Sequence, residues 1–209
     1  MKLNLSSIIT TLKDIRRYVF PIKKIVNKFS GISSLEQLKL FIQERSAHVT
    51  QTTLYGYLKT RIGTRYAMMF EDETFSNSIN IAKWNIYTSC LSDCTLYTFS
   101  YLINKKNLKD DQSKNIFFSI LDQEKENGLP EKIIENAKIE FKQKLKEINW
   151  DTFHAENPFK ESGLALYKWS PISDELKILD KEIVLNSIKL KWNLVENEFK
   201  DLTKNLNFN

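Results

Sequence analysis

Residues 74–103 read TFSNSINIAKWNIYTSCLSDCTLYTFSYLI, and Lys83 and Asp93 are the only charged residues in this stretch. Helical spacing places seven side chains on one stripe, namely Phe75, Ile79, Ala82, Ile86, Cys90, Asp93 and Tyr97. Further apolar residues lie on the other sides, and such a helix is buried on most sides. The stretch predicts a central helix, although the Thr and Tyr residues from 95 to 101 would also suit a strand. Polar side chains interrupt it too often for a membrane span.

Asp93 is a carboxylate near the middle of this predicted buried helix. Burying an unpaired charge is costly, so we expect a cationic partner, with Arg45, Arg61 and Arg65 as the candidates. A catalytic role for the carboxylate is the alternative interpretation.

Cys90 and Cys94 share a face of the same predicted helix. Helical neighbours at this spacing have Cβ atoms about 5 to 6 Å apart, more than the roughly 3.8 Å that a disulfide prefers. A zinc site would need two further ligands, and the histidines of the chain are His48 and His154. We predict two buried, small, apolar side chains and neither a metal nor a cofactor. Two cysteines do not make a secreted disulfide framework, which favours a reducing compartment and a cytoplasmic location.

The segment before the central helix is rich in arginine. The chain has five arginines, and three of them are Arg45, Arg61 and Arg65. An arginine fork holds a carboxylate or a phosphate through two parallel hydrogen bonds, which lysine cannot imitate. We favour an internal partner among the acidic residues 71–73 or Asp93. An external phosphate or carboxylate is the alternative.

If this segment binds a ligand, the candidate site residues are Arg45, Tyr55, Lys59, Arg61, Arg65, Tyr66 and Asp93. Tyrosine rings beside cations can stack nucleic-acid bases, but three tyrosines near three cations are weak evidence for a single-stranded nucleic acid. Residues 1–28 hold seven cations and one anion, whereas the other 181 residues hold 24 cations and 25 anions. Because the body of the chain has no general basic footprint, we do not expect nucleic-acid binding.

Residues 1–29 have apolar side chains at alternating steps of three and four. This pattern predicts a basic amphipathic helix that Pro21 kinks or splits. We favour a helix packed on or beside the rest of a single domain, residues 1–209. The alternatives are peripheral contact with an anionic membrane and docking to a protein partner. Polar residues interrupt every apolar run, so a cleavable signal is not expected.

Local signals divide the rest of the chain into helices. Ser33 and Glu36 have the spacing of a capping box, so a helix should begin there, and Gly63 should end it. Residues 149–172 form a long aromatic-rich connection that wraps the core or covers a site. His154 lies in this connection, and we expect a hydrogen-bonded structural histidine because no nucleophile can be assigned to it.

The final helix begins at Ser173 and has two apolar stripes. The first consists of Leu176, Leu179, Ile183 and Leu190, and the second of Ile188, Trp192, Val195, Phe199, Leu202 and Leu206. The helix should therefore contact neighbours on two sides, with Asn186 and Asn193 as buried polar contacts.

Three segments resemble a family of small, uncharacterised bacterial helical proteins, some of which are labelled esterase. They are TTLYGYLKTRIGTRY (52–66), FEDETFSNSINIAKW (70–84) and DKEIVLNSIKLKW (180–192). The resemblance covers about two thirds of the chain and implies, for some members, ester hydrolysis. A serine esterase of the α/β-hydrolase type needs the pattern G-x-S-x-G, and none of the five glycines begins it. The P-loop and dinucleotide fingerprints are absent too.

The sequence predicts an all-α, single-domain bundle of about six helices with a long central helix pair. A chain of 209 residues can bury one sizeable core without disulfides or metals. We expect a non-enzymatic binding or assembly protein that engages a protein partner or an anionic surface. The alternatives are a helical hydrolase of the esterase type and a phosphate- or nucleic-acid-binding module that uses Arg61 and Arg65.

Overall fold

The computed structural model describes residues 20, 29–108 and 112–206, and these residues form helices and turns without a strand. The helices of ten residues or more are α3 (Leu35–Ile62), α5 (Glu73–Lys106), α6 (Ser113–Lys125), α7 (Glu131–Glu147), α8 (Lys160–Trp169) and α9 (Asp174–Leu202). One-turn elements are η1 (Gly63–Arg65), α4 (Tyr66–Met69) and η2 (Phe153–Ala155). The predicted all-α bundle of about six helices is confirmed.

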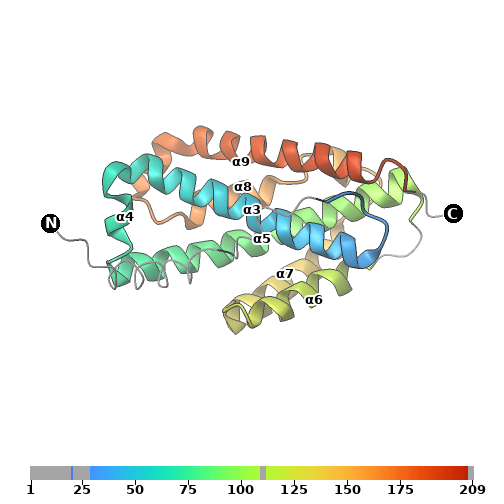
Figure 1. The fold of residues 1–209 in the computed structure, drawn as a ribbon, viewed down its shortest axis with the longest axis horizontal. Helices are drawn as coiled ribbons and strands as arrows, with labels where there is room; N and C mark the ends of the chain where they lie inside the picture. The colour runs from blue at the N-terminus through green and yellow to red at the C-terminus, as the bar shows by residue number, and fades with distance from the viewer. Residues whose placement is uncertain (1–19, 21–28, 109–111, 207–209) are drawn as a thin grey trace.

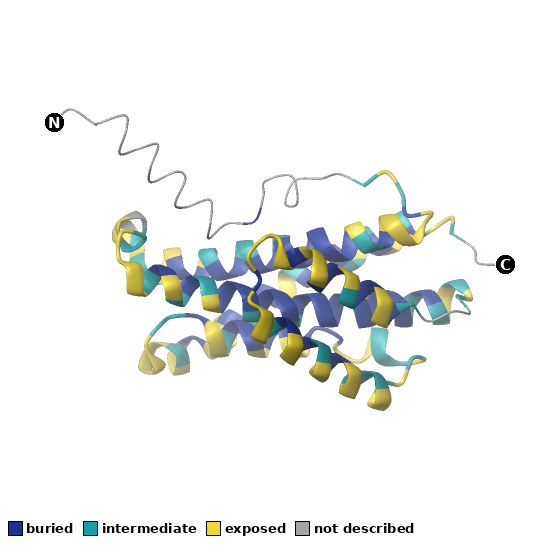
Figure 2. Cartoon of the chain, turned by 90° about the horizontal axis from the view of Figure 1, so that it is seen from below, coloured by how far each residue is buried: buried dark blue, intermediate teal, exposed yellow. Residues whose placement is uncertain are grey.

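Four helices form a ring around the core. α3 packs against α5, α5 against α8, α8 against α9, and α9 against α3. The expected central pair is α3 and α5, and α9 runs beside them as a third long helix (Figure 1). α6 and α7 form a hairpin that packs on α5 outside this ring. Buried residues face the interior of the bundle and exposed residues cover its outer surface (Figure 2).

α3 begins one residue later than the capping box at Ser33 and Glu36 predicts. Ser34 is the N-cap residue, and its hydroxyl accepts a hydrogen bond from the Gln37 backbone N–H at 3.2 Å. The Gln37 side chain reaches back and accepts one from the Ser33 backbone N–H at 2.7 Å. The predicted register is wrong because Ser34, and not Ser33, accepts from the Gln37 N–H, while the Gln37 side chain accepts from Ser33. The helix ends at Gly63, where φ is +66°, as predicted.

α5 remains helical through its Thr- and Tyr-rich residues 95–101, so the strand alternative is wrong. The hydroxyls of Thr95 and Thr98 donate to carbonyl oxygens of their own helix, at 2.7 Å to Leu91 and 3.0 Å to Thr95. These bonds satisfy the buried hydroxyls without a partner strand. The helix has 34 residues and is therefore about 51 Å long.

Most of the predicted N-terminal helix, residues 1–19 and 21–28, lies outside the described residues. Phe20 is described and buried, and its ring centroid lies 5.4 Å from that of Trp84 and 4.9 Å from that of Tyr87. The ring centroid of Phe29 lies 5.5 Å from that of Phe41 on α3. None of the helices that the structure describes combines the length and apolarity needed to cross a membrane.

The connection formed by residues 149–172 contains η2 and α8, and both pack on α5. α8 also lies close to α9 at Gly163, where an added Cβ would stand 3.1 Å from Leu185 Cδ2 and 3.6 Å from Ile188 Cγ2. A glycine at this position lets the two helices approach closely. The connection therefore wraps the core, and it also forms one wall of a groove against α9.

Candidate functional site

Arg61, near the end of α3, pairs with Asp180 on α9. The guanidinium group contacts both carboxylate oxygens, and the Tyr57 hydroxyl donates to Oδ2 at 2.9 Å. Asp180 is 1% exposed, so the arginine compensates a buried carboxylate. The prediction that Arg61 pairs with an acidic residue at 71–73 or with Asp93 is wrong. Of these, Asp72 instead caps α5 by accepting a hydrogen bond from the Phe75 backbone N–H at 2.9 Å.

Arg45 makes a second internal pair between α3 and α9. Its Nε and Nη2 groups donate to the two carboxylate oxygens of Glu198 at 2.6 Å each. The guanidinium carbon also lies 4.9 Å from the centre of the Phe29 ring. Both arginine forks on α3 are therefore engaged by carboxylates of α9 and not presented to an external anion.

Asp93 is buried, as predicted, but its partner is not an arginine. Its Oδ2 accepts hydrogen bonds from the Ser162 backbone N–H and from the Ser162 hydroxyl, both at 2.7 Å. Lys144 Nζ lies 3.5 Å from Oδ1. The arginine prediction is wrong because Arg45 and Arg61 are engaged by α9, while the Ser162 N–H in the first turn of α8 donates to Asp93. Burial raises the pKa of Asp93, and Lys144 and Ser162 oppose that shift.

The remaining predicted site residues do not join these. Tyr55 and Tyr66 pack on Phe70, with ring centroids 6.2 Å and 5.2 Å away respectively, and burial raises the pKa of Tyr66 to about 12. Lys59 and Arg65 are exposed. The structure therefore divides the predicted site among two arginine pairs, a helix cap and an aromatic cluster, and forms no single site from them.

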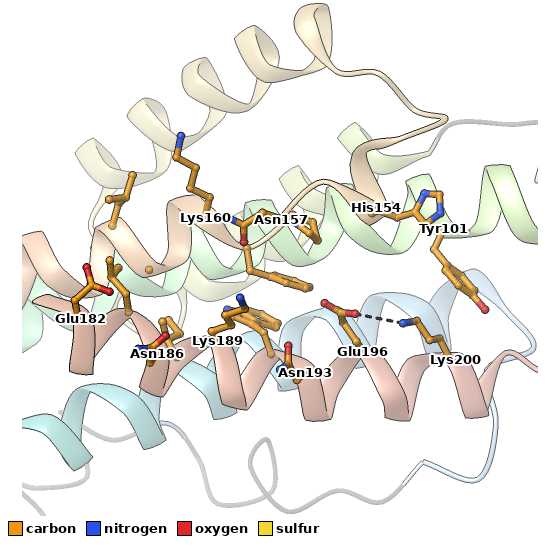
Figure 3. Close-up of a pocket in the computed structure, with 18 of the residues that line it drawn as sticks. Tyr101, His154, Asn157, Lys160, Glu182, Asn186, Lys189, Asn193, Glu196 and Lys200 are labelled. Carbon is orange, nitrogen blue, oxygen red and sulfur yellow. Dashed lines mark hydrogen bonds and ion pairs between the residues drawn. The ribbon is translucent and has the colours of Figure 1, made fainter.

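A groove of about 990 Å³ lies between the segment that contains η2 and α8 on one side and α9 on the other. Figure 3 shows Asn157 and Lys160 on the first wall, and Asn186, Lys189 and Asn193 on the α9 wall. The expectation that Asn186 and Asn193 are buried polar contacts is wrong, because both are exposed and line this groove.

The floor of the groove is aromatic. Phe159 and Trp192 stack with ring centroids 4.2 Å apart and an interplanar angle of 8°. Trp192 is 1% exposed, and its indole Nε1–H has no hydrogen-bond partner among the described residues. The hydroxyl of Tyr97, whose ring lies 5.1 Å from that of Phe159, has none either. Buried donors without acceptors are rare in folded proteins, and the indole N–H of Trp192 is one of them among the described residues.

The rim of the groove is cationic. Five lysines line it, namely Lys105, Lys160, Lys181, Lys189 and Lys200, together with two glutamates, Glu182 and Glu196. Lys200 pairs with Glu196 at 3.3 Å (Figure 3). Neither Lys105, Lys160 nor Lys189 forms an ion pair with a residue that the structure describes. From the periodicity of the sequence alone, these lysines can be interpreted only as part of a solvent-exposed helix face.

His154 also lines the groove, and it is hydrogen-bonded as expected. Its Nδ1 lies 3.1 Å from the Ser100 hydroxyl, which donates to the Trp150 carbonyl at 2.7 Å and accepts from the His154 backbone N–H at 3.0 Å. Burial and the charges of Lys105 and Lys200 lower the pKa of His154. Because Ser100 is buried and its proton is directed to a carbonyl, this pair does not present a nucleophile.

One apolar stripe of α9 is exposed. Its members, which we call the α9 ridge, are Leu176, Leu179, Ile183, Leu190 and Leu194, with exposed fractions from 39% to 75%. The second stripe is buried against the bundle, through Ile188, Trp192, Val195 and Phe199 among others. The prediction that both stripes contact neighbours is therefore wrong for the first stripe, because its residues are exposed while most of the second stripe is buried.

No family model, curated protein or solved structure matches the chain. The esterase-family resemblance of residues 52–66, 70–84 and 180–192 therefore stays a prediction. Among the described side chains, no group of three His, Cys, Asp or Glu residues could hold a metal ion.

Proposed function

We propose that the protein is a non-enzymatic assembly protein that docks a helix on the α9 ridge, and that this helix is α9 of a second copy. The exposure of the five ridge residues carries the proposal. The ridge runs from residue 176 to residue 194, about 27 Å of helix. A row of exposed apolar residues along one helix face is typical of a protein contact, whereas isolated exposed leucines are not.

The apolar residues of the ridge fit an antiparallel second copy. In a twofold antiparallel pair, Leu179 lies between Leu190 and Leu194 of the second copy, and Ile183 lies beside Leu190 of the second copy. Twofold symmetry makes each contact twice, so a short ridge buries a self-complementary surface.

The charged border of the ridge also favours the antiparallel direction. In an antiparallel pair, one side of the ridge lies against the equivalent side of the second copy. Glu182 therefore faces Lys189 of the second copy, and Lys189 faces Glu182 of the second copy. Both residues are exposed. In a parallel pair, Glu182 would face Ser187 and Lys189 would face Leu194, so neither charge would meet an opposite charge.

Sedimentation equilibrium of the full chain over a wide concentration range tests the proposal. We expect a monomer–dimer equilibrium for the wild type. Ile183→Glu should abolish dimer formation because it places a charge in the apolar seam. Ile139→Glu on α7, where the side chain is 55% exposed, is the matched control and should dimerise like the wild type. Circular dichroism should show the same helix content in all three proteins.

A charge exchange tests the direction of pairing. Glu182→Lys and Lys189→Glu should each weaken dimerisation about two- to thirtyfold, since the dimer contains this pair twice and an exposed ion pair contributes about 0.2 to 1 kcal/mol. The double variant Glu182→Lys/Lys189→Glu should restore the wild-type dissociation constant. A wild type that remains monomeric at every concentration would exclude a second copy as the occupant.

A further inference from the structure

The groove between the η2–α8 segment and α9 combines three features, and of the residues that form them the proposed dimer uses only Glu182 and Lys189. Its floor is the stacked pair of Phe159 and Trp192, its rim holds five lysines and two glutamates, and the buried Trp192 N–H has no acceptor among the described residues. We propose that this groove binds a small organic anion with an apolar body, of the chemical class of an acyl carboxylate.

The charge of the groove favours an anion. Residues 29–209 hold 24 cations and 25 anions, yet the groove gathers five lysines against two glutamates. Lys200 and Glu196 pair with each other, and Lys189 faces Glu182 of the second copy in the proposed dimer. Lys105 and Lys160 form no ion pair with a described residue. A cluster of unpaired cations around a concave surface raises the local concentration of anions.

The floor favours an apolar body carrying an oxygen acceptor. Phe159, Ile188 and Leu185 provide apolar contacts, and Gly163 on α8 has no side chain that would fill this part of the groove. An oxygen of the ligand that reached Trp192 Nε1 would give this buried donor an acceptor.

The dimensions of the groove favour a small molecule. A volume of about 990 Å³ lies at the upper end of the range for small-molecule sites, about 300 to 1,000 Å³. Asn157, Asn186 and Asn193 supply further donors along the walls (Figure 3), which can orient a polar head group.

Titration calorimetry with a matched pair of amphiphiles tests the class of ligand. The probes are dodecanoate and dodecyltrimethylammonium, which share a chain length and differ in the sign of the head group, both kept below their micellar concentrations. We expect saturable 1:1 binding of dodecanoate and no binding of the cation. Equal binding of both probes would overturn the proposal, because it would show only general apolar adsorption.

Variants at Lys105 and Lys160 locate the binding. The double variant Lys105→Glu/Lys160→Glu should weaken dodecanoate binding at least about tenfold. Lys142→Glu/Lys146→Glu on α7 makes the same charge change at exposed positions outside the groove and should leave the dissociation constant unchanged. Equal affinities of the two double variants would place the ligand elsewhere and overturn the proposal.

Trp192→Phe tests the donor. Phenylalanine keeps an aromatic ring against Phe159 but removes the N–H, so dodecanoate should bind several-fold more weakly. An unchanged affinity would show that the ligand does not use this donor.

The ligand test and the dimer test are separable. Lys105 and Lys160 lie outside α9, so their variants should dimerise normally. The monomeric variant Ile183→Glu should still bind dodecanoate.

Discussion

Asp93 of α5 accepts two hydrogen bonds from Ser162, one from its backbone N–H and one from its hydroxyl, each 2.7 Å long. Ser162 is the third residue of α8, where backbone N–H groups have no partner within the helix. A carboxylate of one helix therefore caps the N-terminus of another, 69 residues away in the chain. This contact attaches α8 to the central helix and places one wall of the groove.

Asp93→Ala should lower the free energy of unfolding by about 3 kcal/mol, because it leaves the buried Ser162 donors without an acceptor. Urea unfolding followed by circular dichroism measures this loss. Asp93→Asn keeps one acceptor oxygen of similar shape and should cost less. Equal stability of the alanine variant and the wild type would contradict the capping role.

Arg61→Lys and Arg65→Lys should differ in stability. Lysine at position 61 keeps the charge but loses the fork that contacts both oxygens of the buried Asp180, so we expect a loss of about 1 to 3 kcal/mol. Arg65 is exposed, and its substitution should change stability by less than about 0.5 kcal/mol. Thermal melting of both variants checks this difference. A stable Arg61→Lys protein would show that a single ammonium contact is sufficient for Asp180.

Cys90 and Cys94 should be unreactive in the folded protein. Both thiols are buried, and burial raises the pKa of Cys90 to about 12 and that of Cys94 further still. Since the thiolate is the reactive form, a colorimetric thiol reagent at pH 8 should label neither residue until guanidinium is added, and then both. Rapid labelling of the native protein would mean that α5 opens readily.

Lys83 should make stability rise with pH between about 7 and 9. Burial lowers the pKa of this lysine from 10.5 to about 8, although the charge of Glu124 opposes the shift. Between pH 8 and 10.5 the unfolded chain therefore binds the proton more tightly than the folded protein, so raising the pH favours folding.

Between pH 7 and 9, deprotonation of Lys83 should raise the free energy of unfolding by about 1 kcal/mol, since one pKa unit corresponds to 1.36 kcal/mol. Lys83→Met, in which the titrating group is absent, should show a flatter profile in urea unfolding over this range. The measurement stops at pH 9 because the raised pKa values of Cys90 and Cys94 lower the stability as the pH rises further. A wild type and a variant with parallel profiles would contradict the prediction.

Local sequence signals predicted the helices well because burial and capping depend on neighbouring residues. A run with two charges in thirty residues must be surrounded by other elements, and α5 is buried along most of its length. Gly63 ends α3 because a positive φ suits glycine. The shift from Ser33 to Ser34 at the start of α3 shows the limit of such signals, since two overlapping serine pairs satisfied the same pattern.

Contacts between distant segments could not be predicted in this way. Arg61 and Asp180 are separated by 119 residues, and Arg45 and Glu198 by 153. Nothing local to either arginine distinguishes these carboxylates from those that lie nearby in the chain. The partner of Asp93 is partly a backbone N–H, which no side-chain pattern marks. The groove likewise depends on how η2, α8 and α9 meet, so its lysines resemble an ordinary solvated face in the sequence.

The two carboxylates that neutralise Arg45 and Arg61 both lie on α9, which has consequences for folding during translation. At about 5 to 20 residues per second, the ribosome needs roughly 6 to 24 s to add the 119 residues between Arg61 and Asp180. During that interval α3 and α5 can pair, but Asp180 and Glu198 have not yet been added and the side of the bundle that α9 covers is open. Chaperones that recognise apolar surface should therefore bind the nascent chain until α9 emerges.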